Sequence, residues 1–246
     1  MRRKHLYLIV MVFSTVLFLV SCGSAKVYAP VSHQYASIKP NSTAHIVRRG
    51  DTLYSIAWQL RRDYREIARW NNIRPPYTIY TGQELTLIAP YHAAKKRNRT
   101  VIKSTKTVKK QQLTKKSSSN NKKTLKLSWA WPINVRQVEK DRANSGVILI
   151  GSPGELVRSS ESGKVVYAGN GLKGYGNLLI IMHNEEFLTA YGYNKRLLVD
   201  EGSVVKKGQA IAEIGKDSKQ RQILFFELRR HGKAVTISQY LPKYGR

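Results

Sequence analysis

The last third of the chain most constrains its fold, because it consists of apolar runs separated by glycines. Such runs, rich in Val, Ile, Leu, Phe and Tyr, occur at 163–169, 174–183, 202–215 and 224–228. Short apolar segments bounded by glycines are typical of strands joined by tight turns. The pattern predicts a domain of short, mostly antiparallel strands in this part of the chain.

The composition restricts the partners and the metal sites. With 43 Lys and Arg against 15 Asp and Glu, the formal net charge is +28, which indicates an anionic partner such as nucleic acid, lipid or a wall polymer. Cys22 is the single cysteine, so an intramolecular disulfide and a Cys-based metal site are both excluded. The six histidines form no H-x-H or H-x-x-x-H pair, which argues against zinc.

The N-terminus has the features of an export signal. Basic residues at 2–4 precede an apolar run at 6–20, which is too short to cross a bilayer core of ~30 Å as a helix. Residues 19–22, Leu-Val-Ser-Cys, resemble a bacterial lipobox, which implies that the Cys22 thiol is acylated after cleavage. The alternative is an ordinary secretory signal with an incidental cysteine. We expect a lipoprotein signal peptide at 1–21 and a disordered spacer at 22–44, and export removes nucleic acid as a partner.

Residues 45–88 have the pattern of a small module with two helices. A strand and a turn should lead into a first helix capped by Asp51, with one apolar face formed by Leu53, Ile56, Ala57 and Leu60. A second helix should follow Asp63, with Ile67 and Trp70 directed inward, and end at 71–72. A turn and a final strand are expected within 80–87.

The same residues resemble a LysM module. The resemblance is carried by V-x-x-G-D-T-L-x-x-I-A, then N-N-I, then G-Q-x-L. It implies a βααβ fold that binds N-acetylglucosamine-containing glycan, here peptidoglycan. The glycan groove would lie between two loops, formed by Gly50, Asp51, Thr52 and Leu53 and by Asn72, Ile73, Arg74 and Pro75. Alternatively, the first loop only caps the helix while Leu53 and Ile73 belong to the core, and the two roles are compatible.

Residues 89–128 separate this module from the strand-rich part. Thirteen Lys or Arg and no Asp or Glu lie between Tyr91 and Leu127, without a sustained apolar period. Such a segment cannot bury enough apolar surface to offset its ordering entropy, so it should be a disordered basic linker. It is either a solvated spacer or a segment that binds an anionic surface. In the second case each basic residue near charged lipid would contribute ~1 kcal/mol of binding free energy.

Residues 129–242 resemble the LytM, or lysostaphin-type, metallopeptidase domain, in its NlpD-like branch. The resemblance is carried by the glycine-bounded runs, by Tyr-Gly-Tyr at 191–193 and by Leu-Phe-Phe-Glu at 224–227. It implies an antiparallel β domain of the duplicated-hybrid-motif type. The expected fold class is therefore α+β and multi-domain, with a βααβ LysM module and a mostly β C-terminal domain joined by the basic linker.

The residues that the family uses for zinc and catalysis are absent at the matching positions. Members bind zinc through two His and one Asp, leave a position open for water, and use further His residues as bases. Here the matching positions hold Asn144, Ile148, Tyr193, Ile223 and Phe225. Zinc and hydrolysis are therefore not expected. His183 should be a hydrogen-bonded structural residue, and His231 should lie in an exposed hairpin turn.

For function, the resemblance implies a lipid-anchored protein that is sorted to the outer membrane, faces the periplasm and activates an N-acetylmuramoyl-L-alanine amidase in division. The partner surface would be the former active-site groove, formed by Ile148, Tyr175, Tyr193 and Phe225. Alternatively, these side chains only fill the vacated cavity. Two other functions stay open: a passive tether between membrane and peptidoglycan, and a zinc endopeptidase with unfamiliar ligands.

Overall fold

A computed structural model describes residues 38–39, 41–90, 127–141 and 145–243. The predicted signal peptide at 1–21, the lipidation site Cys22, most of the spacer and of the basic linker, and Asn144 lie outside these residues. The described residues belong to one compact unit, which contains two modules. No helix in the described part of the chain combines the length and the apolar character needed to cross a membrane.

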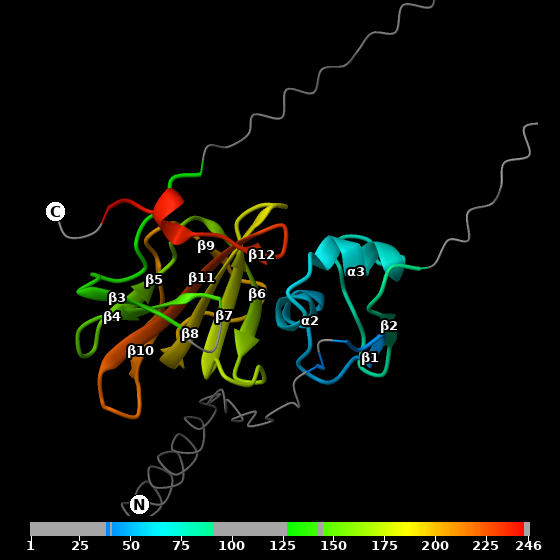
Figure 1. Ribbon diagram of the computed structural model, residues 1–246, viewed down its shortest axis with the longest axis horizontal. Helices are drawn as coiled ribbons and strands as arrows, with labels where there is room; N and C mark the ends of the chain where they lie inside the picture. Colours follow the sequence, from blue (N-terminus) through cyan, green and yellow to red (C-terminus); the bar gives the residue numbers. More distant parts are fainter. Residues whose placement is uncertain (1–37, 40, 91–126, 142–144, 244–246) are drawn as a thin grey trace, which may run out of the picture. The chain divides into compact units, whose positions relative to one another are not determined.

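The N-terminal module has the predicted order of strand, two helices and strand (Figure 1). Strand β1 pairs antiparallel with β2, and His45 lies opposite Leu85. The bounds of the four elements are β1 Ala44–Ile46, α2 Leu53–Gln59, α3 Tyr64–Trp70 and β2 Glu84–Thr86. The predicted βααβ fold is therefore confirmed.

Helix α2 begins one residue later than the sequence pattern predicted. Thr52, with extended dihedral angles, is the N-cap and accepts a hydrogen bond from the backbone of Ser55, whose side chain accepts one from Thr52 in return. Asp51 instead binds His45 Nε2 at 2.7 Å and the Arg48 N–H at 2.9 Å. The prediction that Asp51 caps the helix is therefore wrong, because its carboxylate is used to close the preceding turn.

Helix α3 follows the prediction closely. Asp63 is its N-cap and accepts a hydrogen bond from the Arg65 N–H at 2.9 Å. Ile67 is fully buried, while Trp70 is only half-buried. The C-cap, Asn71, also exchanges two side-chain hydrogen bonds with the backbone of Thr86, which attach the end of the helix to β2.

In the described part of the C-terminal module, ten antiparallel strands form a single sheet (Figure 1). Its main order is β3-β4-β11-β10-β8-β7-β6-β9, with β12 beside β11 and β5 beside β10. The bounds are β3 Gln137–Lys140, β4 Val147–Ile150, β5 Leu156–Arg158, β6 Gly163–Gly169, β7 Asn177–Met182, β8 Phe187–Leu197, β9 Val204–Val205, β10 Ala210–Lys216, β11 Gln222–Arg230 and β12 Lys233–Ala234, followed by the 3-10 helix η1 Ile237–Gln239.

The sheet buries apolar side chains on both faces. Along β11, Leu224, Phe226 and Leu228 pack into one core, which also includes Trp129. Phe225 points to the other face and belongs to a cluster that contains the core of the N-terminal module. Because alternate residues of a strand face opposite sides, β11 contributes to both cores.

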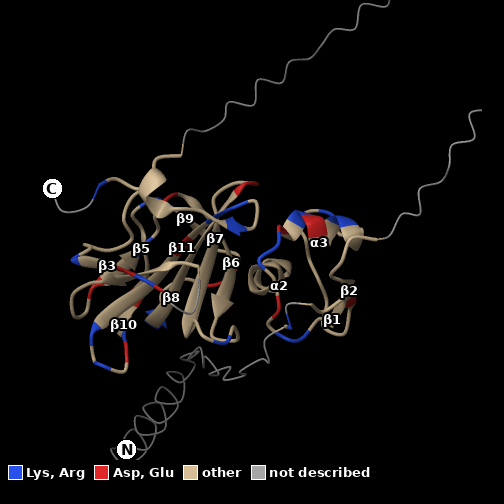
Figure 2. Ribbon diagram, in the orientation of Figure 1, with Lys and Arg blue, Asp and Glu red and all other residues tan. Residues whose placement is uncertain are grey.

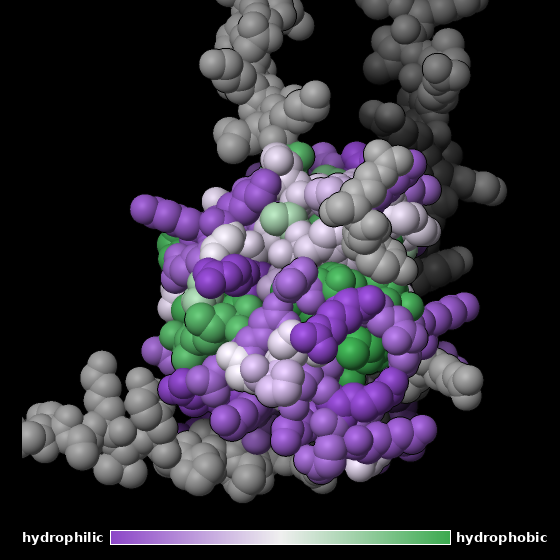
Figure 3. Space-filling model, turned by 90° about the vertical axis from the view of Figure 1, so that its left-hand side faces the viewer, coloured by the Kyte–Doolittle hydropathy of each residue, from purple (hydrophilic) through white to green (hydrophobic). Residues whose placement is uncertain are grey.

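Charged residues gather on the turns of the sheet and on α3, whereas most strand residues are uncharged (Figure 2). One side of the C-terminal module is mostly hydrophilic, with apolar patches between long polar side chains (Figure 3). Two charged residues of β11, Glu227 and Arg229, are buried instead, and they lie in the candidate site.

Candidate functional site

Two of the family's ligand positions, Ile148 and Phe225, and one catalytic position, Tyr193, come together on the neighbouring strands β4, β8 and β11. Phe225 on β11 pairs with Ile148 on β4 and with Gly192 on β8, which places Tyr193 beside it. The ring centroid of Tyr193 lies 6.3 Å from that of Phe225, and that of Tyr175, from the turn before β7, lies 5.1 Å away. The four residues predicted to form a groove therefore belong to one apolar cluster.

The side chains at these positions do not fit a zinc ion. Ile148, Ile223 and Phe225 have no lone pair to donate, whereas protein-bound zinc requires Cys, His or carboxylate ligands. Burial raises the pKa of the Tyr193 phenol, which keeps this group neutral. Within the described ranges, no three His, Cys, Asp or Glu residues are grouped so that they could hold a metal. No hydrolytic step can be derived from this donor set.

His183 has the structural role that the sequence predicted. Its Nδ1 lies 2.9 Å from the Ser162 carbonyl oxygen and its Nε2 lies 2.7 Å from Thr189 Oγ1, which in turn lies 2.9 Å from the Tyr191 hydroxyl. The ring also packs edge-on against Trp129. Burial lowers the pKa of His183 to about 4, so the imidazole is neutral at physiological pH.

A buried ion pair lies on the same face of β11 as Phe225. Arg229 Nε donates to Glu227 Oε1 at 2.5 Å, and the Ser145 hydroxyl donates to the same oxygen at 3.0 Å. Both charged side chains are about 2% exposed or less. The sequence signal for this ion pair is the alternation of Glu227 and Arg229 with the apolar residues of β11, and the motif-based prediction of the site did not include it.

Arg229 connects the sheet to helix α2 of the N-terminal module. Its Nη1 donates to the Trp58 carbonyl oxygen at 2.7 Å, and its guanidinium carbon lies 3.5 Å from the centre of the Trp58 ring. A guanidinium over an indole face is a favourable cation–π contact, and it is stronger when both groups are buried. Trp58 is 2% exposed, so this contact is sealed from solvent.

The predicted groove is therefore covered rather than open. Phe225 is fully buried and packs in the same cluster as Trp58. Ile148, Tyr175 and Tyr193 are half-buried against this cluster. In this arrangement the N-terminal module occupies the face on which a partner was expected.

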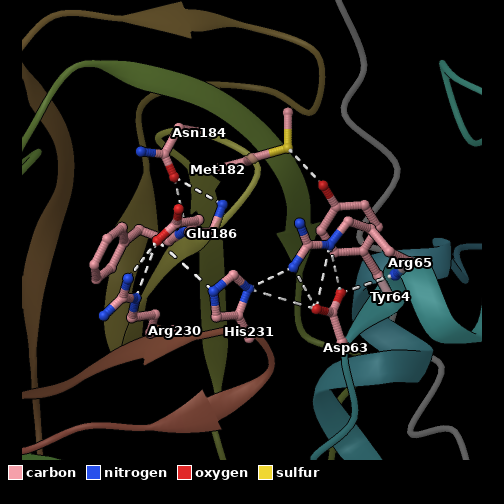
Figure 4. A network of polar contacts seen from close by, with 9 residues as sticks. Asp63, Tyr64, Arg65, Met182, Asn184, Glu186, Arg230 and His231 are labelled. Atoms are coloured by element: carbon pink, nitrogen blue, oxygen red, sulfur yellow. Dashed lines mark hydrogen bonds and ion pairs between the residues drawn. The ribbon is translucent and has the colours of Figure 1, made fainter. Parts of the chain in front are cut away.

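A polar network lies at the contact between α3 and the turn that joins β11 to β12 (Figure 4). Arg65 on α3 forms an ion pair with Asp63 at 2.6 Å and lies 2.5 Å from His231 Nδ1 in the turn between β11 and β12. His231 Nε2 lies 3.7 Å from Glu186, which forms an ion pair with Arg230 at 2.9 Å. Burial alone would raise the pKa of Asp63, but its hydrogen bonds with Arg65 bring the pKa below the usual value. His231 lies in an exposed hairpin turn, as predicted.

The predicted glycan loops meet at a cavity of about 490 Å³. Of the eight residues proposed from sequence, Asp51, Thr52, Leu53 and Pro75 line it. The other four are not among its lining residues; these are Gly50, Asn72, Ile73 and Arg74. The turn after the proline pair contributes residues that the sequence did not indicate, namely Pro76, Tyr77, Thr78 and Ile79.

The two modules match known family descriptions. Residues 45–87 match the LysM domain, and residues 142–237 match peptidase family M23. Both matches agree with the resemblances drawn from the sequence motifs.

Three curated relatives extend the similarity along most of the chain. A lipoprotein NlpD/LppB homolog of Pseudomonas aeruginosa is 40% identical over 231 residues, covering 82% of this chain and 78% of the relative. The uncharacterized lipoprotein YgeR of Escherichia coli is 34% identical, covering 96% of this chain and 93% of the relative. The murein hydrolase activator NlpD of Escherichia coli is 32% identical, covering 86% of this chain and 72% of the relative. The chain therefore belongs to the NlpD/LppB family of lipoproteins and joins a LysM domain to a domain of peptidase family M23.

Proposed function

We propose that this protein binds peptidoglycan in the cell envelope and activates an N-acetylmuramoyl-L-alanine amidase without cleaving the wall itself. The observation that supports this most is that apolar residues stand at three of the family's ligand and catalytic positions: Ile148 and Phe225 at ligand positions and Ile223 at a catalytic one. A protein named murein hydrolase activator is 32% identical to this chain. An M23-type domain without zinc donors keeps a folded surface for a partner but lacks the group that activates water. The protein would work without a zinc cofactor.

The LysM module would hold the protein on the glycan strands. Its loops line one wall of a cavity with backbone and small polar groups beside aromatic and proline rings, including Thr52, Pro75 and Tyr77. Sugar binding needs this combination of hydrogen-bonding groups and an apolar floor.

Acylation of Cys22 would anchor the chain in a membrane, in line with the lipoprotein names of its relatives. We place the anchor in the outer membrane, with the folded modules in the periplasm. The basic segment at 89–128 would add attraction to an anionic surface, which high salt should weaken.

Activation of the amidase would be a shift between its closed and open states. An activator produces such a shift only if it binds the open state more tightly than the closed one. The face with Tyr175, Tyr193 and Phe225 offers aromatic side chains of the kind that dominate protein interfaces. Because the LysM module packs on this face, partner binding there requires the two modules to separate.

The test is release of dye from labelled peptidoglycan by the chain without residues 1–22, alone and mixed with each amidase of the same cell. We expect no release by the chain alone, and faster release in the mixture than with the amidase alone. Addition of a zinc chelator to the chain alone provides the control for a trace peptidase.

Two outcomes would contradict the proposal. Chelator-sensitive release by the chain alone would make it a zinc endopeptidase with other ligands. Unchanged rates with every amidase, together with retained binding to peptidoglycan, would make it a passive tether.

A further inference from the structure

The cavity at the glycan loops has a second wall that comes from the C-terminal module. On this side it is lined by Lys164, Val165 and Val166 of β6, by Met182 of β7, and by Glu201 and Gly202 from the turn before β9. Nothing in the LysM sequence pattern predicts these residues, which lie more than one hundred positions away from the first loop.

Specific contacts hold the second wall beside the LysM loops. The Tyr54 hydroxyl lies 3.5 Å from the sulfur of Met182, and the Tyr64 hydroxyl lies 3.8 Å from the same atom. The rings of Tyr54 and Tyr64 pack together with Tyr77, at centroid distances of 4.5 Å and 5.2 Å for the Tyr54–Tyr64 and Tyr64–Tyr77 pairs. Met182 is half-buried and is in direct contact with the LysM module, so the cavity is not an open gap between unconnected surfaces.

Register then fixes where Lys164 points. Lys164 is directly opposite Met182 in the β6–β7 pair. Directly opposed residues of antiparallel strands project from the same face of the sheet. The ammonium group of Lys164 therefore extends from the same wall as the Met182 side chain, on the side of the LysM loops.

The charges on this wall are available to a ligand. Lys164 is exposed, and within the described ranges its side chain makes no hydrogen bond or ion pair with another residue. The neighbouring Glu201 is likewise without such a partner there. Burial raises the pKa of Glu201, and the positive charge of the nearby Lys164 opposes this rise.

A peptidoglycan strand combines the chemistry of both walls. Its amino sugars carry the hydroxyl and acetamido groups that the LysM loops would bind, and its peptide stems carry carboxylates. An ammonium pairs with a carboxylate in a charge-assisted hydrogen bond, which is stronger than a neutral one. Chitin oligomers have the same N-acetylglucosamine units but no carboxylate, so they would use only the LysM wall.

We propose that the glycan site spans both modules, with Lys164 of the M23-type domain binding a stem-peptide carboxylate beside the sugar held by the LysM loops. This inference rests on the proposed glycan binding of the LysM module. It assigns to the degenerate domain a part in recognising peptidoglycan, and it makes the site selective for strands that still carry peptide stems.

The test compares two probes on the chain without residues 1–22: a chitin tetramer, and a stem-bearing peptidoglycan oligomer of matched sugar length. Lys164→Gln removes the charge and keeps most of the side-chain length. The matched control is Lys173→Gln, an exposed lysine in the turn before β7 that does not line the cavity. Melting temperatures of both variants establish that they remain folded.

We expect Lys164→Gln to bind the stem-bearing oligomer about tenfold more weakly, as for loss of one charge-assisted hydrogen bond. Its affinity for the chitin tetramer should be unchanged, and Lys173→Gln should bind both probes normally. Equal affinities of Lys164→Gln and the unchanged chain for the stem-bearing oligomer would overturn the inference while leaving LysM binding intact. Failure of the unchanged chain to bind either probe would overturn the glycan binding itself and this inference with it.

Discussion

At the scale of single residues, the most demanding feature is a charged pair buried between two modules. Arg229 and Glu227 are both removed from water; Glu227 Oε1 accepts hydrogen bonds from Arg229 and Ser145, and Arg229 also donates to the Trp58 carbonyl oxygen. Removing one partner of such a pair leaves an uncompensated charge in a medium of low polarity, which costs much more than the pair contributes. The pair should therefore tolerate joint replacement better than single replacement.

Glu227→Gln or Arg229→Met alone should each lower the free energy of unfolding by about 3–5 kcal/mol. The double variant should lose less than the sum of the two single losses, because it buries no unpaired charge. Urea unfolding of the four proteins measures this coupling. Arg230→Met is the control, since Arg230 is half exposed and its change should stay within about 0.5 kcal/mol. Additive losses in the double variant would contradict the expected coupling.

His183 should make the stability of the C-terminal module depend on pH. Its pKa falls from about 6.5 when unfolded to about 4 when folded, because burial disfavours the charged ring. Between these values the unfolded chain binds more protons, so this contribution is complete above pH 6.5 and is lost as the pH falls toward 4. The groups around the ring are the Ser162 carbonyl, Thr189 and Trp129, with Glu161 as the nearby charge.

The check is urea unfolding at pH 7 and pH 5 for the unchanged chain and for His183→Gln. The free energy of unfolding should differ less between pH 7 and pH 5 for His183→Gln than for the unchanged chain. His231→Gln, in the hairpin turn, should show the same difference as the unchanged chain. Asp63, with a lowered pKa, adds a loss of stability at lower pH, near and below its ordinary value. The same pH dependence in His183→Gln as in the unchanged chain would refute the assignment to His183.

At the scale of elements, short helices of the LysM module depend on their ends. Helix α2 has seven residues, and isolated helices of this length are not stable in water. Its stability comes from the buried face with Leu53, Ile56 and Ala57 and from the reciprocal hydrogen bonds of Thr52 and Ser55. The cap also fixes the loop that lines the cavity.

Thr52→Ala should destabilise α2 by about 1 kcal/mol, since the N-cap loses its side-chain acceptor. Amide hydrogen exchange in α2 measures the free energy of its opening. Thr78→Ala, an exposed threonine outside the helices, is the matched control and should leave that exchange unchanged. Equal effects of the two substitutions would show that the cap does not stabilise the helix.

At the scale of the whole molecule, the contact between the modules covers the surface proposed for the amidase. A methyl group at Gly232, in the turn before β12, would collide with the backbone of Arg62 and Asp63 in the LysM module. Gly208 has almost the same left-handed φ, +76° against +74°, but has open space around its Cα. An alanine at either position strains the backbone of its turn, but only the alanine at Gly232 also pushes against the LysM module. Comparing the two variants therefore isolates the effect of displacing that module.

Gly232→Ala should loosen the contact between the modules and raise amidase-dependent dye release above that of the unchanged chain. Gly208→Ala pays a similar backbone cost of ~1–2 kcal/mol and should leave the release unchanged. Hydrogen exchange of β11 in both variants reports whether the face with Phe225 has become accessible. Equal release by the two variants would contradict the idea that the LysM module shields this face.

The sequence by itself determined the local elements and the loss of the zinc ligands. Both helices, the strands and the structural role of His183 follow from periodicity, turn residues and composition, which act between near neighbours. The replacement of donor groups by Ile148, Ile223 and Phe225 is likewise a property of the residue types alone. The N-cap of α2 shows what local sequence cannot determine. Asp51 and Thr52 are both residue types that cap helices, and the bond between Asp51 and His45, which only the structure shows, leaves Thr52 as the cap.

Only the tertiary structure decided which surfaces meet. Three features join residues that are far apart in the sequence: the stacking of Arg229 on Trp58, the contact of Met182 with Tyr54, and the position of Lys164 at the glycan loops. Such contacts form when two apolar faces pack together. The local sequence pattern shows that a face is apolar, but it does not show which other face will cover it. For that reason the sequence left open whether these side chains form a partner groove or fill a vacated cavity, whereas the structure shows that face covered by the other module of the same chain.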